Sequence, residues 1–443
     1  MNWNYFRVLT SLKKDFNIVF FVRDLNRIQG RWCSLMSCSG SKYVVAVYLC
    51  FAVISGLAQG TSGLGNAVSA EYRHDLAYRL QQPMIDGLDV SVALTDWFSA
   101  EKVVGPNAEA QKENLYLHAM ASLKELAPLP VTPWPENPTD VTLTWLESFA
   151  VPDLSNYFGS SGKPPAGVNA RIVEYEVDHL KLYGVVLWPS APGRYPPILY
   201  LHGASFGVPT YSLAWLAQIA KRGYTIVAPA LRGEDLFSAG EYLRKVKQYT
   251  CEGQIENLDG EVDDALGMMD GAFKLEMVKP GKFAILGHSF GAGVGLLVAA
   301  RSPQVACVVS YDAWLVNPFR YYWDRLRDGP NNWFSWDAYT RQPVADQLAG
   351  LMKRSVVHHT DCLKAPVLLF IGGAYNGSVF HQSHADLVER LKQRGRTYRY
   401  VIVPGGGHNF VLNSNDQPAR TAFPIQDKWL ETYFPPQSPA VLP

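Results

Sequence analysis

The chain has 443 residues, of which 48% are hydrophobic, so it is long enough to bury the core of one large domain or of two ordinary ones. Its 40 basic and 40 acidic side chains give a formal net charge of zero, which argues against a general nucleic-acid-binding protein, because such a protein needs a basic excess to neutralise phosphates. Aromatic residues make up 12% of the chain, which suits an enzyme with an aromatic-lined pocket, although aromatic side chains serve more often in a core.

The first 58 residues differ from the rest of the chain. An apolar stretch over residues 43–58 follows Lys42 and ends in small residues, which is the pattern of a signal peptide. It is shorter than the roughly 20 residues that a membrane-spanning helix needs. We expect translation to start at Met36, residues 1–58 to act as a cleaved signal peptide or as a membrane anchor, and the protein to be exported to the periplasm or secreted.

Residues 59–168 have a helical and irregular pattern. Ala108–Ala127 is predicted to be an amphipathic helix that ends before a proline-rich stretch, because proline is excluded from helix interiors and from central strands. We expect this part to be an N-terminal extension that packs on the main domain, which runs from residue 169 to residue 443.

Short apolar runs alternate with helical patterns from residue 169 onward. Two strands are predicted over residues 170–177 and 180–189, paired across a turn at Asp178 and His179. The later apolar runs begin near residues 196, 224, 282, 305, 365 and 398. Continuous apolar strands that alternate with helices predict an α/β fold with a mostly parallel central sheet, helices on both faces and functional residues at the carboxyl ends of the strands.

A Gly-x-Ser-x-Gly motif stands between a predicted strand and a predicted helix at Gly287–Gly291. The motif alone is weak, since a chain of this length and composition holds about 0.2 matches by chance. The strand–turn–helix setting strengthens it, because a nucleophilic serine is held on such a sharp turn and the flanking glycines permit the turn. Ser289 is therefore the predicted nucleophile.

An oxyanion that forms on a substrate carbonyl needs preorganised hydrogen-bond donors. One is expected to be the backbone N–H of Phe290, at the start of the helix after the serine. The second is expected to be that of Ala204, because the preceding glycine lets this N–H turn toward the site. His202, in the same loop, is expected to brace it and not to act as a base.

The general base comes last in the chain order that accompanies this motif, after the serine and the acid. His408 follows the last predicted strand on a glycine-rich loop, and it is the predicted base. The pairs His358–His359 and His381/His384 are predicted to lie on the surface. The second pair has a spacing that could bind a metal ion, but no third ligand accompanies it.

The position of the acid distinguishes this chain from many hydrolases that have the same serine motif. In many hydrolases with this motif it follows the strand that is predicted here near residue 365, in a pattern resembling G-x-x-D-x-x-V, but this chain has Asn376 in that position. An amide carries no charge to stabilise the imidazolium, and the loss of turnover can reach about 10⁴-fold. Asp312 ends the strand before it and preserves the order of serine, acid and base. We predict Asp312 as the acid, and the alternative is that it caps the following segment.

The motifs GHSFGA and YDAW, with Asp312 23 positions after Ser289, resemble the α/β-hydrolase superfamily and more narrowly the platelet-activating factor acetylhydrolase group of lipases. The resemblance covers about residues 170–434 and implies the α/β-hydrolase fold. Dienelactone-hydrolase-like and prolyl-oligopeptidase-like domains are similar in their strands. Those two families keep the acid where Asn376 stands. The chain departs from the lipase group at Ala292, where that group has a second glycine, and in the long segment after the acid, so the resemblance bears more on mechanism than on substrate.

A long segment, residues 315–342, follows the predicted acid and is rich in aromatic residues. It is too long for an ordinary loop and is predicted to be a lid or pocket wall over an apolar acyl group, with a packed excursion or a dimer contact as the alternatives. A second insertion, residues 233–256, is expected to form the opposite wall. We expect substrate contacts from Phe206, His288, Trp314, Phe319, Tyr322 and Trp323.

Together these residues predict a serine hydrolase that cleaves carboxylic esters, short-acyl or lipid-like, through an acyl-enzyme on Ser289. The alternatives are a peptidase or amidase of the prolyl-oligopeptidase type and a non-catalytic binding protein with the same fold. No metal or cofactor is predicted, since the cysteines beyond the leader have no zinc spacing. The expected partner is a small-molecule ester or a lipid, with no nucleic acid and with membrane contact only through the leader or a lipid substrate.

Overall fold

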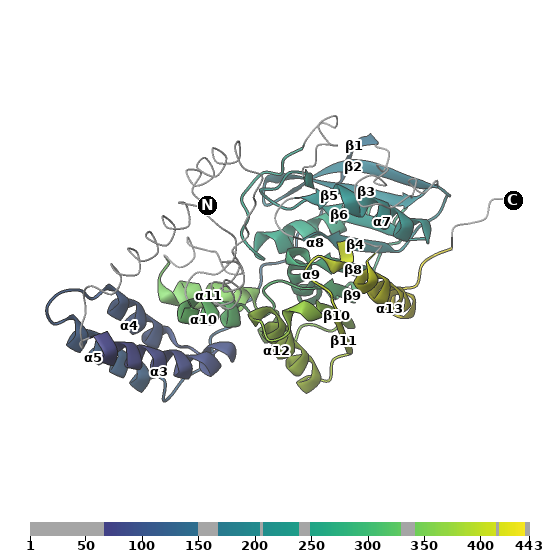
Figure 1. The fold of residues 1–443 in the computed structure, drawn as a ribbon. Helices are drawn as coiled ribbons and strands as arrows, with labels where there is room; N and C mark the ends of the chain where they lie inside the picture. The colour runs from purple at the N-terminus through teal and green to yellow at the C-terminus, as the bar shows by residue number, and fades with distance from the viewer. Residues whose placement is uncertain are drawn as a thin grey trace, which may run out of the picture. The chain divides into compact units, whose positions relative to one another are not determined.

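The computed structural model describes residues 66–148, 167–203, 207–238, 249–328, 342–412 and 416–438. The predictions for the leader, including the start at Met36, lie outside these residues. The chain from Ala67 onward forms one compact unit (Figure 1). Within the described ranges no helix is both long enough and apolar enough to cross a membrane.

A nine-stranded sheet organises the described part of the chain, in the order β1-β2-β3-β6-β4-β8-β9-β10-β11. Its strands are β1 Thr144–Ser148, β2 Val168–Val177, β3 Leu180–Pro189, β4 Pro197–Leu201, β6 Thr225–Pro229, β8 Phe283–His288, β9 Val305–Tyr311, β10 Val367–Gly372 and β11 Tyr398–Val403. The pairs from β1 to β6 are antiparallel and those from β6 to β11 are parallel. The spatial order differs from the chain order where β6 lies between β3 and β4. This strand order is that of the α/β-hydrolase fold, as the sequence predicts.

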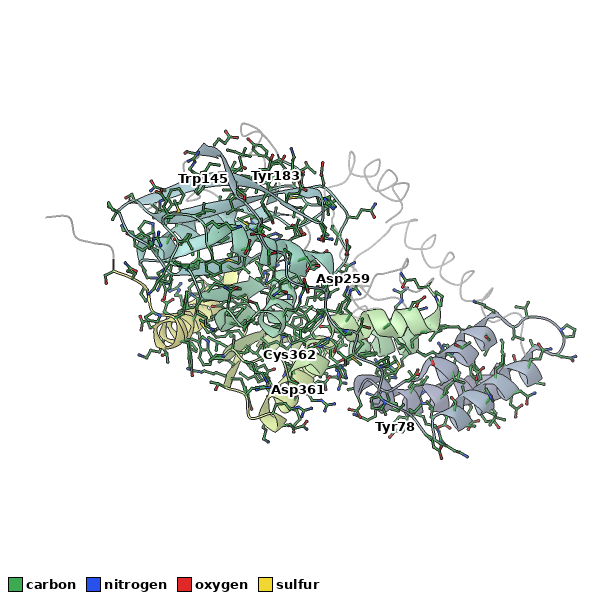
Figure 2. All side chains as sticks on the ribbon, turned by 180° about the vertical axis from the view of Figure 1, so that it is seen from behind. Tyr78, Trp145, Tyr183, Asp259, Asp361 and Cys362 are labelled. Atoms are coloured by element: carbon green, nitrogen blue, oxygen red, sulfur yellow. The ribbon has the colours of Figure 1, made fainter. Side chains whose placement is uncertain are left out.

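The antiparallel edge of the sheet begins with the predicted hairpin. β2 and β3 pair along their whole length, and the turn residues Asp178 and His179 both have positive φ, at 52° and 64°. Two positive φ values in a two-residue turn match the right-handed twist of the strands it joins. Trp145 of β1 and Tyr183 of β3 mark this edge in Figure 2.

The central strands are buried because helices cover both faces of the sheet. Every residue of β4, β6, β8 and β10 is buried, whereas the edge strand β11 is only partly covered. Helices α8 (Gly260–Ala272) and α9 (Phe290–Arg301) pack on one face, and α7 (Thr210–Lys221) and α13 (Gln417–Tyr433) lie together on the other, where Trp215 stacks on Phe423 (Figure 1). A short parallel pair, β5 (Val208–Pro209) and β7 (Phe237–Ser238), stands apart from the main sheet.

The N-terminal extension is helical where the structure describes it. It contains α3 (Asn66–Ile85), α4 (Ser91–Lys102) and α5 (Ala108–Ser122). The predicted helix from residue 108 is confirmed, although it ends at Ser122, before the prolines. Helix α4 packs against α11 (Val344–Arg354), and α10 (Pro318–Asp328) and α12 (Val379–Gln393) complete this side of the unit.

Candidate active site

Ser289 stands alone between the end of β8 and the start of α9. Its backbone has φ 53° and ψ −115°, a conformation that is strained for a residue with a side chain. Two hydrogen bonds hold this turn: Ser289 N–H donates to Tyr311 O (2.8 Å), and Trp314 N–H donates to Ser289 O (2.8 Å). The sharp turn presents the serine hydroxyl at the carboxyl edge of the sheet.

Glycines flank the serine because the backbone on both sides is crowded. A Cβ atom at Gly287 would lie 2.7 Å from Cα of Ala292, and one at Gly291 would lie 2.4 Å from the main-chain oxygen of His202. The Gly291 N–H donates to that same oxygen (2.9 Å). The glycines of the motif are therefore required by close packing, as well as by the turn itself.

The structure brings Ser289 and His408 together. The serine Oγ lies 2.7 Å from Nε2 of the imidazole. His408 stands on the loop after β11, and this loop is fixed to the end of β10, because Ala374 N–H donates to Gly406 O (3.0 Å). A Cβ atom at Gly372 would lie 2.5 Å from the same oxygen, so the two loops are in close contact.

Asp312 lies on the other side of the imidazole. Its Oδ2 is 3.9 Å from His408 Nδ1, which is longer than a hydrogen bond but close enough for a direct charge interaction. The aspartate is fully buried, and its Oδ1 accepts the Gly372 N–H (2.7 Å). Like Ser289, Asp312 has a positive φ, at 47°. Asn376 is exposed by contrast, and its backbone N–H donates to Gly373 O (3.4 Å).

Burial sets the protonation of this group of side chains. It lowers the pKa of His408 to about 3, and the neighbouring His288 and His384 act in the same direction. Burial also raises the pKa of Asp312 well above its usual value, against the effect of the hydrogen bond from Gly372. The imidazole of His408 is therefore neutral at neutral pH, which is the form that can accept the serine proton.

One of the two predicted oxyanion donors falls within the described residues. Phe290 is the first residue of α9, where a backbone N–H has no acceptor within the helix and is available to a ligand. Ala204 and Phe206 lie outside the described residues. The residue before this stretch, Gly203, is described and packs against the ring of His288.

Aromatic rings surround the imidazole and the start of α9. Tyr375 and Phe380 both meet His408 edge to face, with ring centroids 5.9 Å and 5.4 Å away. The ring of Phe290 stacks on that of Trp314 at 5.7 Å. Sequence reasoning missed Tyr375 and Phe380, and their only signal is that they follow the same strand as the position of Asn376.

Three of the side chains predicted to contact substrate, all on α10, are buried in packing in the structure. The ring of Phe319 meets that of His358 at 5.3 Å, the hydroxyl of Tyr322 donates to Gln347, and Trp323 Nε1 donates to the main-chain oxygen of Ala77 in α3 (2.9 Å). Phe319 and Tyr322 are 0% exposed and Trp323 is 6% exposed. The described part of the aromatic segment is thus a packed helix, α10, and its Trp323 contacts the N-terminal helix α3.

The prediction that the other histidines lie on the surface is wrong. His359 is 4% exposed and His384 is 0% exposed. Each donates a ring N–H to a backbone carbonyl, His359 to Met352 (3.1 Å) and His384 to Phe380 (2.9 Å), which makes burial of the neutral ring tolerable. In the described ranges no three His, Cys, Asp or Glu side chains are grouped so that they could hold a metal ion.

Comparisons with known proteins place this site in a family. The model of the prolyl oligopeptidase family matches residues 210–436. A Synechocystis sp. protein named "Putative carboxymethylenebutenolidase" is 26% identical over 152 residues, which cover 32% of this chain and 58% of that protein. The chain thus spans little more than half the length of this curated relative.

Solved structures also resemble the chain. The uncomplexed acylaminoacyl peptidase of Pyrococcus horikoshii matches 65% of this chain and 45% of its own, with 17% identity and a TM-score of 0.47. Acetyl xylan esterase 1 from Thermoanaerobacterium sp. matches 65% of this chain and 87% of its own, with 17% identity and a TM-score of 0.42. The family match covers more than half of the chain, including the serine turn and the histidine that contacts it. The chain belongs to the prolyl oligopeptidase family and has the α/β-hydrolase fold.

Proposed function

We propose that the protein is a carboxylic-ester hydrolase that works through an acyl-enzyme on Ser289. His408 takes the serine proton at Nε2 while Ser289 Oγ attacks the acyl carbonyl. The Phe290 N–H donates to the oxyanion, and Asp312 stabilises the imidazolium. The imidazolium then gives its proton to the departing alcohol, and water, activated by the same base, cleaves the acyl-enzyme.

The observation that carries the choice of ester over amide is the 3.9 Å between His408 Nδ1 and Asp312 Oδ2. A carboxylate at this distance, beside a buried ring, stabilises the imidazolium less than a direct hydrogen bond does. An amine must be protonated before it can leave, so an amide depends strongly on the imidazolium. The alcohol of an ester leaves more readily, and its cleavage tolerates a weaker acid partner.

One further observation supports an uncharged acyl group, and a second supports an ester. The rings of Tyr375 and Phe380, which meet His408, are aromatic and uncharged. The same is true of Phe290 and Trp314 beside the serine. The name of the Synechocystis relative denotes a carboxyl-bearing butenolide, which is a cyclic ester, so it supports ester cleavage and not the absence of charge. We therefore propose short-acyl or lipid-like esters as the substrate class, and an exported protein as the setting.

The second candidate is a peptidase or amidase, which the prolyl oligopeptidase family match favours. The two candidates separate in one assay. Purified protein is given p-nitrophenyl esters of rising acyl length and, in parallel, peptide p-nitroanilides, and kcat/KM is measured for each with Ser289→Ala as the blank. We expect ester turnover at least about 10²-fold above anilide turnover. Preference for an anilide would replace the ester proposal with the peptidase, and no turnover with either would favour a binding protein.

A further inference from the structure

His288 occupies an unusual place in the candidate active site. It is the last residue of β8 and directly precedes Ser289, and it is only 5% exposed. Its Nε2 lies 2.8 Å from the main-chain oxygen of His408. One side chain therefore links the backbone of the nucleophile to the backbone of the base.

The direction of this hydrogen bond fixes the state of the ring. A carbonyl oxygen can only accept, so Nε2 of His288 carries the proton and donates it. Burial lowers the pKa of His288 to about 4, and the nearby His202 acts in the same direction, so the ring is neutral at neutral pH. A neutral donor suits this place, because the ring centroids of His288 and His408 are 5.3 Å apart and a charge on the first would oppose the imidazolium on the second.

The opposite edge of the His288 ring faces the loop on which the second oxyanion donor is expected. A Cβ atom at Gly203 would lie 2.4 Å from Nδ1 of His288 and 3.2 Å from Cβ of Ser289. The ring is thus confined between the backbone at Gly203 and the carbonyl of His408. The ring contacts the loop of the base at His408 and the backbone at Gly203, and its own residue directly precedes the nucleophile.

The loop that carries His408 is fixed to the end of β10 at Gly406, and the hydrogen bond from His288 adds an anchor at the base itself. Gly405, Gly406 and Gly407 precede the base, and glycine has the least intrinsic conformational restriction of any residue. A Cβ atom at Gly405 or Gly407 would meet nothing within 4 Å, so a side chain at either position would have no packing partner there. The hydrogen bond from His288 acts at the residue where the loop must be placed accurately.

We propose, on the basis of the serine-hydrolase chemistry proposed above, that His288 is a positioning residue: its Nε2–H holds the main-chain carbonyl of His408 and thereby keeps the imidazole within reach of Ser289 Oγ. His288 does not exchange a proton with the substrate. This replaces the substrate contact that the sequence predicts for it. Misplacement of a catalytic group by about 1 Å can cost about 10²-fold in rate, which sets the size of the effect.

The test compares substitutions that differ in the reach of their donor. His288→Gln places an amide N–H near the position of Nε2, His288→Asn places one only near Nδ1, and His288→Leu removes the donor. For each, kcat and KM on a p-nitrophenyl ester and the rate constant of fluorophosphonate labelling are measured on folded protein. We expect His288→Asn and His288→Leu to lower kcat and the labelling rate constant by about 10²-fold with little change in KM, and His288→Gln to recover at least tenfold of that loss.

His359→Leu is the matched control. It also removes a buried histidine that donates to a backbone carbonyl, but its partner is Met352, and its ring, in the short helix η5 (Val356–His359), lies against that of Trp134. It is expected to lower Tm while kcat stays within about two-fold of the wild type. Equal losses of kcat in His288→Gln and His288→Asn, or wild-type kcat in both, would overturn the positioning role. Wild-type protein that neither labels nor turns over ester would instead overturn the proposed function.

Discussion

Oδ2 of Asp312 lies 3.9 Å from Nδ1 of His408, while the other carboxylate oxygen accepts the Gly372 N–H at 2.7 Å. Gly372 ends β10, the strand after which similar families carry their acid, and Asp312 follows the neighbouring strand β9. Adjacent strands are about 4.8 Å apart, so a carboxylate that moves by one strand can still reach the same imidazole. The Gly372 N–H then holds the relocated group in place.

The acid assignment predicts unequal effects at two positions. Asp312→Asn is expected to lower kcat by about 10²-fold or more, because the neutral amide cannot stabilise the imidazolium on His408, although the 3.9 Å separation makes the loss smaller than the ~10⁴-fold of a directly hydrogen-bonded acid. Asn376→Ala is expected to change kcat by less than about three-fold, since that side chain is exposed. Both values come from steady-state kinetics on one ester. The reverse ranking would move the acid to the loop after β10.

Trp323 tests whether α10 is part of the substrate site. Trp323→Phe removes the hydrogen bond from Nε1 to Ala77 O and is expected to cost about 1 kcal/mol of unfolding free energy. KM for esters of any acyl length is expected to stay within about two-fold, because the ring packs against the N-terminal helices. Denaturant unfolding and ester kinetics on the same preparation check both values. A large rise in KM with unchanged stability would restore the lid interpretation for the described part of the segment.

Gly291 tests the close packing behind the serine. Gly291→Ala would place a methyl group 2.4 Å from the main-chain oxygen of His202, where no flexible side chain can move aside. We expect a loss of about 3 kcal/mol or more in stability, together with loss of esterase activity. Gly295→Ala on the same helix is the control, because its methyl group would meet side chains and no backbone, Ile285 at 2.7 Å and Leu201 at 3.3 Å. Equal tolerance of both substitutions would contradict the packing described here.

Buried histidines give the protein a dependence on pH that can be isolated at His384. The ring is 0% exposed, and burial lowers its pKa to about 4, whereas the pKa of a histidine in the unfolded chain is about 6.5. The unfolded state therefore binds more protons between these values, and the stability that the neutral ring contributes at neutral pH is lost as the pH falls through this window.

The measurement compares the wild type with His384→Gln, which does not titrate. The substitution is expected to be destabilising at pH 7.5. Its deficit relative to the wild type is expected to shrink by about 2 kcal/mol at pH 5, because only the wild type loses stability through this group. Denaturant titrations at both pH values give the two differences. A deficit that stays constant between them would show that His384 is not held neutral.

The serine turn and the base could be predicted from the sequence because their signals are local. Gly287 and Gly291 follow an apolar strand and open a helix, and His408 is the histidine that follows the last strand. Asp312 required an extra step, the exclusion of Asn376, which works because strand ends meet at one edge of a parallel sheet.

The side chains around the site could not be predicted in the same way. A run of aromatic residues has the same pattern in a pocket wall and in a packed helix, and α10 turned out to be packed. The contacts of Tyr375 and Phe380 with His408 depend on how two loops meet in space, as does the burial of His384. No periodicity in the sequence encodes those distances.

The most direct test of the central claim is to label the purified protein with a fluorophosphonate and to map the adduct by peptide mass spectrometry. The account predicts a single adduct on Ser289, a labelling rate that falls by about 10³-fold or more in His408→Ala, and no adduct in Ser289→Ala. An adduct on another serine, or unchanged labelling in His408→Ala, would contradict it.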